Sequence, residues 1–239
     1  MKISIHSLLE GATRATGTVA VIDVFRAFTT AAVALANGAS GIVMVRSVDE
    51  ALALRKAGIG HICMGEVRGR APDGFDFGNS PFEISGVDFG ARTIIQRTSA
   101  GTQGIVVAAT EADRLYAASL VTAEATVRAL LSGPPDHVSL VAMGENGLKR
   151  TDEDELCAIH LRNRLEGRLG DPDAIRRLIL AGGEVGRFHD PARPYLHPED
   201  VDIALDIDRY CFAVRVEFEN GHPVARIETP TITIPKSPT

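Results

Sequence analysis

Tryptophan is absent from this chain, and aromatic residues make up only 5% of its 239 residues. Proteins that bind single-stranded nucleic acid stack bases on aromatic rings, so this composition argues against such a surface. An excess of positive charge is lacking too, because the formal net charge is −6. No general basic field attracts a phosphate backbone, so we expect no nucleic-acid partner, and any anion binding must be local.

Cysteine pairs and long apolar runs are also missing. The three cysteines, Cys63, Cys157 and Cys211, are far apart and form no Cys-x-x-Cys motif, which excludes a disulfide framework or a zinc knuckle. The sequence contains no run of about 18 apolar residues, the length that a membrane helix needs, and its first residues show no signal-peptide pattern. We therefore expect a cytoplasmic protein that does not enter a membrane.

What the chain does have is alternation of strand and helix patterns, with enough apolar residues (45%) for a large core. Apolar runs predict buried strands, and Ala-rich or amphipathic stretches between them predict helices that end at Gly38 and Gly58. Ser47 and Glu50 have the spacing of a capping box. The strands are expected at residues 18–24, 41–47 and 61–66, and the helices at 25–38 and 47–58. This order is typical of parallel βαβ units, and we expect one α/β domain over residues 1–239.

The rest of the chain extends this pattern, although residues 171–208 are difficult to assign beyond a loop at 190–200. Asn220-Gly221, between two alternating runs, predicts a C-terminal hairpin over residues 211–229. Thr122 is expected to cap the next helix, and 229–239 to be extended. The further strands are expected at 91–99, 113–120 and 136–144, the helices at 122–133 and 152–167, and a loop at 99–104.

Five polar segments follow predicted strands: residues 23–30, 65–70, 97–104, 143–147 and 150–155. In a parallel sheet, ligands bind beyond the carboxyl ends of the strands, where helix N-termini point. We therefore expect these segments to converge on one site.

Asp23 ends a strand, where it could bind a cation or simply cap the following helix. Arg26 lies in the first turn of that helix, and because a cation there opposes the helix dipole, a bound anion is the natural partner; a plain surface arginine is the alternative. Carboxylates at Glu66 and in the run 152–155 suit Mg²⁺, although that run could equally be a helix N-terminal charge cluster.

The loop at 97–104 resembles a phosphate cradle, because its hydroxyls and glycines can present N–H groups to an oxyanion. It is not a Walker A motif. Other phosphatase motifs are excluded by spacing: Asp23 lacks the second aspartate of the haloacid dehalogenase type, and four residues rather than five separate Cys63 from Arg68.

The segment GFDFGNSPFEISG, residues 74–86, cannot be a regular helix because Gly78 and Pro81 interrupt it. Together with VIDVFRAFTTAAVALANGA, GEVRG, TSAGTQG, SLVTAEA and DEDELCA, its GFDFGNSP motif resembles the 2-phosphosulfolactate phosphatase family, clearly over residues 19–159. The resemblance implies a three-layer α/β/α fold with a largely parallel or mixed sheet. It also implies Mg²⁺-dependent hydrolysis of 2-phospho-3-sulfolactate to 3-sulfolactate on the route to coenzyme M. One departure is Ala100, where the family often has Asn.

The resemblance implies a small anionic phosphorylated substrate, and a homodimer stays open. Glu145 is a candidate base or a plain loop carboxylate, and Ser99 or Thr98 could be a covalent nucleophile. In the GFDFGNSP loop, Asp76 and Asn79 would reach the ligand or metal unless the loop is only a packed crossover turn. The predicted catalytic residues are Asp23, Arg26 and Glu145; the metal ligands are Asp23, Glu66, Asp76 and Asp154; the substrate-binding residues are Arg68, Asn79, Arg97, Thr98, Ser99, Gly101 and Thr102.

Two alternatives to the family activity stay open. One is a phosphatase of the same fold that acts on another small phosphorylated hydroxy acid. The other is a non-catalytic module that binds anions.

Overall fold

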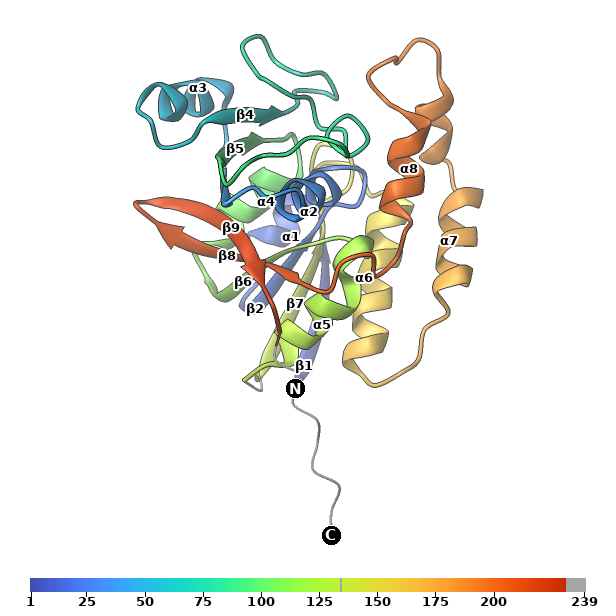
Figure 1. Ribbon diagram of the computed structural model, residues 1–239. Coiled ribbons are helices and arrows are strands. Elements are labelled where there is room, and N and C mark those ends of the chain that lie inside the picture. The colour runs from blue at the N-terminus through green and yellow to red at the C-terminus, as the bar shows by residue number, and fades with distance from the viewer. Residues whose placement is uncertain (134, 231–239) are drawn as a thin grey trace.

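A computed structural model describes residues 1–133 and 135–230 (Figure 1). Nine strands form one sheet, in the spatial order β1-β7-β2-β6-β8-β9-β3-β5-β4. The strands are β1 (Lys2–Ser7), β2 (Gly17–Ile22), β3 (Gly41–Met44), β4 (Ile62–Gly65), β5 (Thr93–Arg97), β6 (Ala112–Ala118), β7 (His137–Ala142), β8 (Ala213–Glu219) and β9 (His222–Glu228). The α-helices are α1 (Leu8–Ala12), α2 (Ala27–Ala36), α3 (Val48–Lys56), α4 (Gly101–Ala108), α5 (Ala123–Leu131), α6 (Asp152–Leu165), α7 (Pro172–Ala181) and α8 (Pro198–Ala204), and the 3₁₀ helices are η1 (Leu120–Thr122) and η2 (Val185–His189).

The sheet consists of two parallel sets joined by an antiparallel hairpin. Strands β1, β7, β2 and β6 are parallel, and so are β3, β5 and β4. The C-terminal hairpin β8–β9 pairs with β6 on one side and with β3 on the other, so it connects the two sets (Figure 1). The predicted hairpin is confirmed: Asn220 and Gly221 have φ of 52° and 84°, as a type I′ turn requires.

The helices cover both faces of the sheet, which gives the expected three layers. Side chains alternate along β2: Val19 and Val21 pack in a core with α2 and α4, whereas Ala20 and Ile22 pack in a second core with α5 and α6. Alternation of this kind follows from the two-residue period of a strand, and both faces of β2 are apolar because both are covered.

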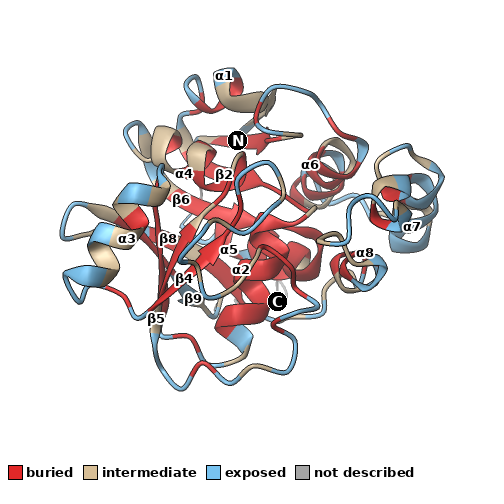
Figure 2. Cartoon of the chain, turned by 90° about the horizontal axis from the view of Figure 1, so that it is seen from above, coloured by how far each residue is buried: buried red, intermediate tan, exposed pale blue. Residues whose placement is uncertain are grey.

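The core around α2 explains how the two parallel sets meet. Nine of the ten residues of α2 are buried, and Figure 2 shows this helix in the interior of the molecule. Helices α2 and α4 contact β6 from the first set and β3 from the second, so the same two helices pack against both sets. Residues that follow strands of both sets line one cleft, although the sets run in opposite senses through the antiparallel pairings.

Several elements differ from the sequence-based expectation. The predicted loop at 99–104 is mostly the start of α4, and β1 and α1 had not been predicted. Residues 171–208 form α7, η2 and α8, and α8 begins inside the expected loop at 190–200. Thr122 occupies an N-cap position, but its hydroxyl donates to Ser119 O instead of capping α5. Ser47 does cap α3, by accepting from the Glu50 N–H.

The described residues include no helix that is both long and apolar enough to span a membrane. The expected extended segment at 229–239 lies outside the described residues from position 231 onward.

Candidate active site

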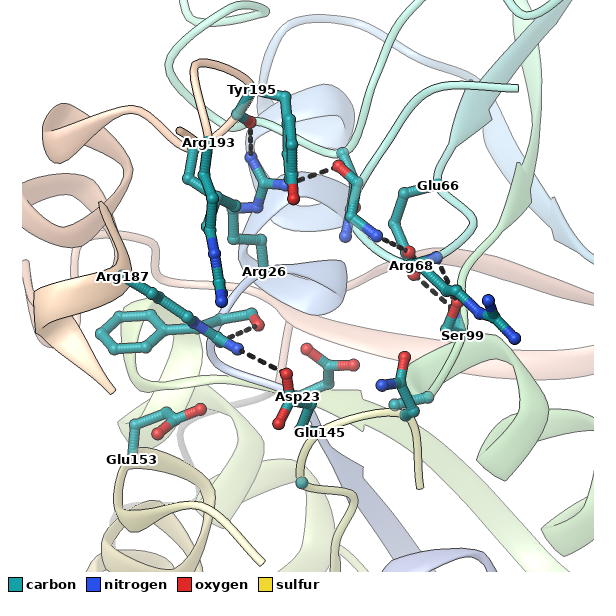
Figure 3. Close-up of a pocket in the computed structure, with 17 residues that line it drawn as sticks. Asp23, Arg26, Glu66, Arg68, Ser99, Glu145, Glu153, Arg187, Arg193 and Tyr195 are labelled. Atoms are coloured by element: carbon teal, nitrogen blue, oxygen red, sulfur yellow. Dashed lines mark hydrogen bonds and ion pairs between the residues drawn. The ribbon is translucent and has the colours of Figure 1, made fainter. Parts of the chain in front are cut away.

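A cleft of about 330 Å³ lies where β2, β4, β5 and β7 end. Figure 3 shows Arg187 and Arg193 along one side of it, Glu66 and Ser99 along the opposite side, and Asp23 and Glu145 between them. A cleft of this size and position is typical of a small-molecule site in an α/β protein. Its lining residues are Asp23, Phe25, Arg26, Glu66, Arg68, Gly69, Asn79, Ser99, Ala100, Gly144, Glu145, Asn146, Glu153, Arg187, Arg193, Tyr195 and Leu196.

Asp23 caps the following helix and also lies at the cleft. It follows β2 directly, is 6% exposed and lines the cleft. Its Oδ1 accepts the Ala27 N–H at 3.0 Å, so it also caps the start of α2. Burial, and to a smaller extent the charge of Glu66, raise the pKa of Asp23 to about 6, against the opposing effect of the Ala27 and Gly101 N–H groups. Such a carboxyl group can exchange protons near neutral pH or accept a cation.

Asp154 and Glu153, at the start of α6, lie close to Asp23. Both Asp154 oxygens are occupied: Oδ1 accepts the Val24 N–H at 2.7 Å and Oδ2 the Gly144 N–H at 2.8 Å. Asp154 therefore ties the ends of β2 and β7 together below the cleft and is not among the residues that line it.

Glu153, which the sequence reasoning did not select, does line the cleft, and its Oε2 is buried with no hydrogen-bond partner among the described residues. Burial raises the pKa of Glu153 to about 7. The acidic run 152–155 had indicated this place, but a sequence alone does not show which side chain of a helical turn faces inward.

Glu66, which the sequence predicted as a metal ligand, lines the cleft and braces two loops. Its carboxylate accepts the Ser99 N–H and, at 2.6 Å, the Gly69 N–H. Arg97 donates to Glu66 O at 2.6 Å but is not among the residues that line the cleft, so its position is that of a support. Gly65 precedes Glu66 with φ of 142°, and a Cβ there would lie 1.9 Å from Arg97 O, so only glycine fits this close approach.

The loop before α4 uses most of its hydroxyls internally. Thr98 and Thr102 are buried and bind each other's backbone: Thr98 Oγ1 accepts the Thr102 N–H at 3.0 Å, and Thr102 Oγ1 accepts the Thr98 N–H at 2.8 Å. Only Ser99 and Ala100 line the cleft. Gly101 is a spacer, since a Cβ there would lie 2.9 Å from Asp23 Oδ2. The prediction that Thr98, Gly101 and Thr102 present groups directly to a substrate is therefore not supported by where they lie.

Arg26 lines the cleft, but a protein carboxylate compensates its charge. Its guanidinium forms a buried ion pair with Asp200 at 2.8 Å and donates to Tyr195 O at 3.0 Å and Gly69 O at 3.5 Å. The group that offsets this cation is therefore Asp200 and not the bound anion that the sequence suggested as the natural partner. Arg26 instead connects α2 to two segments that are distant in sequence.

Of the two polar residues in the GFDFGNSP segment that were predicted to reach the ligand or metal, one lies at the cleft and one does not. Asn79 lines the cleft, and its Oδ1 is buried without a hydrogen-bond partner among the described residues. Asp76 lies elsewhere: its Oδ2 accepts the Cys63 N–H at 2.8 Å and pairs with Arg55 at 2.9 Å. Phe77 anchors the segment against Phe89, with ring centroids 5.8 Å apart. Asp76 thus fixes this loop and does not reach the cleft.

A family model described as 2-phosphosulpholactate phosphatase matches residues 4–181. The chain belongs to this family. It is 36% identical over 154 residues to a probable 2-phosphosulfolactate phosphatase of Thermotoga petrophila, a match that covers 64% of this chain and 65% of that protein. It is 32% identical over 185 residues to a protein of the same description from Bacillus subtilis, covering 76% and 78%. The family resemblance inferred from the motifs is confirmed.

Within this 2-phosphosulpholactate phosphatase family member, part of the cleft comes from beyond the matched residues. Arg187, Arg193, Tyr195 and Leu196 all follow position 181. Sequence reasoning missed them because η2 and the proline-broken segment after it have no regular apolar period. The only signal was the presence of arginines in a segment rich in proline.

The predicted set of four metal ligands does not form. Asp23 and Glu66 line the cleft, whereas Asp154 lies beneath it and Asp76 outside it. Among the described residues, no group of three His, Cys, Asp or Glu side chains is placed to hold a metal ion. Mg²⁺, however, is commonly bound by one or two carboxylates together with water and phosphate oxygens. Asp23 and the unpartnered Oε2 of Glu153 fit that smaller requirement, because a cation would relieve the unfavourable burial of both carboxylates.

Proposed function

We propose that this protein is a phosphatase that hydrolyses 2-phospho-3-sulfolactate to 3-sulfolactate and inorganic phosphate, as in the route to coenzyme M. One observation carries the proposal: buried carboxylates and several arginines face each other across a cleft in a chain of the 2-phosphosulpholactate phosphatase family. The partner is then a small phosphorylated anion in the cytoplasm, and neither nucleic acid nor a membrane is needed.

In this proposal the phosphoryl group of the substrate binds on the side of the cleft formed by Ser99, Ala100 and Arg68. Ala100 immediately precedes α4, whose N-terminus carries partial positive charge toward the cleft. Arg68 lines the cleft and forms no ion pair with a carboxylate among the described residues, so its guanidinium is free to bind an anion. These groups support a phosphate on a protein whose net charge is negative.

Glu145 is proposed to orient the attacking water. It lines the cleft and makes only loose ion pairs, at 3.7 Å with Arg187 and 3.8 Å with Lys149. The water oxygen forms a bond to phosphorus while Glu145 accepts its proton, and the bond from phosphorus to the substrate C2 oxygen breaks. The leaving oxygen takes up a proton from solvent, and Glu145 returns its own proton to solvent, so the net reaction consumes one water.

Asp23 and Glu153 would hold Mg²⁺ in this cleft. When bound, the cation offsets negative charge on the phosphoryl oxygens. Arg26 and Glu66 hold the surrounding loops in place through contacts that the protein makes by itself.

The decisive experiment measures phosphate released from 2-phospho-3-sulfolactate, with and without Mg²⁺, by the wild type and Asp23→Asn. We expect Mg²⁺-dependent turnover that Asp23→Asn abolishes. Turnover only of other phosphorylated hydroxy acids would show that the family name overstates the substrate. If the protein binds these anions but releases no phosphate under any condition, it is an anion-binding module and the proposal is wrong.

A further inference from the structure

The two sides of the cleft come from different parts of the chain. Asp23, Glu66, Ser99 and Glu153 belong to the residues that the family model matches. Facing them is a segment that we call the C-terminal wall, residues 185–197, which follows the matched part. Figure 3 shows Arg187 and Arg193 of this wall directed into the cleft, opposite Glu66 and Ser99. The groups proposed for the reaction and the groups that face them are thus separable in sequence.

The C-terminal wall is held firmly against the matched part. Phe188 is 2% exposed and packs edge-on against Phe25, with ring centroids 5.2 Å apart. Arg26 donates to Tyr195 O, and the guanidinium of Arg70 lies 4.6 Å from the centroid of the Tyr195 ring. These contacts order the wall before any ligand binds, so its arginines present a preformed surface.

The two wall arginines have unused hydrogen-bonding capacity. The Nε of Arg187 is buried and has no partner among the described residues. Its Nη2 donates to Phe25 O at 3.4 Å, and its Nη1 lies 3.3 Å from Glu184 and 3.7 Å from Glu145, so these contacts hold the side chain at the cleft. Arg193 pairs with Asp190 through Nε at 3.3 Å, which leaves its terminal nitrogens available. A planar guanidinium suits a carboxylate or a sulfonate, which it can bind through two donors.

We propose that Arg187 and Arg193 determine specificity by binding the anionic group of the substrate that does not react. The substrates are then phosphate esters that have a second anionic group near the ester carbon. Phosphate esters without such a group should be poor substrates. This inference rests on the proposed function and deepens it, because it assigns phosphoryl binding and recognition of the second anion to opposite sides of one cleft.

The test compares substrates that share a skeleton and differ in that second group. Glycerol 2-phosphate has a neutral hydroxymethyl group where 2-phosphoglycerate has a carboxylate, and 2-phospho-3-sulfolactate adds a sulfonate. Phosphate release gives kcat/KM for the wild type, Arg187→Gln and Arg193→Gln. Arg177→Gln is the matched control, because Arg177 is exposed on α7 and does not line the cleft.

We expect the wild type to prefer the two acids. Loss of one charged donor should lower kcat/KM for them by roughly 10- to 100-fold in Arg187→Gln, following the usual strength of charge-assisted hydrogen bonds. The loss for glycerol 2-phosphate should be at least about tenfold smaller, and Arg177→Gln should match the wild type on all three. Equal losses on all three substrates, or a wild type without preference, would overturn the inference.

Calorimetric titration separates this inference from the proposed function. If the wild type releases no phosphate, the proposed function fails, but the affinities for 2-phosphoglycerate and glycerol 2-phosphate can still be compared. Weaker binding of the acid alone in Arg187→Gln would support the wall as the site for the second anion. Equal binding of both compounds by the wild type would refute it.

Discussion

Glu153 shows how a single buried residue can be unfavourable to the fold and useful to the site. The residue is 2% exposed, and one of its carboxyl oxygens has no hydrogen-bond partner among the described residues. Proteins keep such groups mainly at functional sites, where a ligand or cation relieves the cost. This cost should be measurable as a dependence of stability on pH.

We predict that Glu153→Gln stabilises the metal-free protein at pH 8 and has little effect near pH 4.5. The pKa of Glu153 is raised by burial to about 7 from 4.5, so the folded state holds its proton more tightly than the unfolded state. The contribution of protonated Glu153 to the free energy of unfolding is therefore fully present below about pH 4.5. It is lost as the pH rises through 7. Gln resembles the protonated acid, so its gain at pH 8 should be about 1–3 kcal/mol.

Urea unfolding in the presence of a chelator, at both pH values, measures this difference. Glu155→Gln in the same helix is the control, with the opposite sign. Burial alone would raise the pKa of Glu155, but hydrogen bonds from Arg150 and Ser7 lower it, so removing that carboxylate should destabilise the protein at pH 8. A Glu153→Gln variant less stable than the wild type at pH 8 would contradict the prediction.

Gly101 gives a second prediction at the scale of one residue. An added Cβ would lie 2.8 Å from Ala27 Cβ and 2.9 Å from Asp23 Oδ2, closer than real contacts allow. Gly101→Ala should push Asp23 out of place, and small displacements in an active site can cost on the order of 100-fold in rate. Phosphate-release kinetics should show this loss, whereas Gly86→Ala, which has open space around it, should behave like the wild type. Full activity in Gly101→Ala would show that the position of Asp23 is not critical.

At the scale of elements, the regular βαβ part could be predicted because its signals are local. Ser47 caps α3, and Gly38, with φ of 89°, follows α2 as expected. Helix α4 was missed because its glycines serve tertiary packing: a Cβ on Gly104 would meet Met143 Sδ at 2.4 Å. Asp23 and Glu66 could be predicted as site residues in the same way, because each directly follows an apolar strand in the sequence. The C-terminal wall was not predicted, since Arg26 holds the wall through Tyr195 O, which lies 169 positions further along the chain.

Arg26 also pairs with Asp200, and this pair yields a prediction about how α2 and α8 are joined. Both side chains are buried, at 4% and 0% exposure. Arg26→Ala would leave Asp200 charged and unpaired, and should cost about 3–5 kcal/mol of the free energy of unfolding. Adding Asp200→Asn should recover part of this loss, because the two donors to Oδ1, Ser80 Oγ and the Phe82 N–H, can still bond to an amide oxygen.

A double-mutant cycle in urea measures the coupling between these two residues. The exposed pair Arg14–Glu10 serves as the control, and Arg14→Ala should change stability by less than about 1 kcal/mol. If the changes in the free energy of unfolding caused by Arg26→Ala and Asp200→Asn simply add in the double variant, the pair does not join α2 to α8. Any loss of activity in Arg26→Ala should then be read with this stability cost in mind.

At the scale of the whole molecule, the last two strands in sequence occupy the middle of the sheet. Strands β8 and β9 lie between β6 and β3 and provide the link within the sheet between the two parallel sets. The Asn-Gly turn between two alternating runs predicted this hairpin. It did not predict the position of the hairpin in the sheet, because the pairing partner of a strand depends on contacts between residues far apart in the chain. The cleft depends on both sets, since Asp23 follows a strand of one and Glu66 a strand of the other. Weakening the hairpin should therefore destabilise both sets together.

Gly221→Val tests this coupling, with Gly221→Asn as the milder control. Gly221 has φ of 84°, a conformation that Asn tolerates and a β-branched residue does not, so Val should cost about 2 kcal/mol and Asn clearly less. Cys63 in β4 and Cys157 in α6 are buried thiols, one associated with each set, and the exposed Cys211 can be replaced by serine. Pulsed thiol labelling across a urea series then reports on each set separately. If the hairpin joins the sets, Gly221→Val should lower the urea midpoint of both thiols by the same amount, because opening either set breaks the shared pairing. Exposure of Cys63 at a lower urea concentration than Cys157 would show instead that the two sets unfold independently.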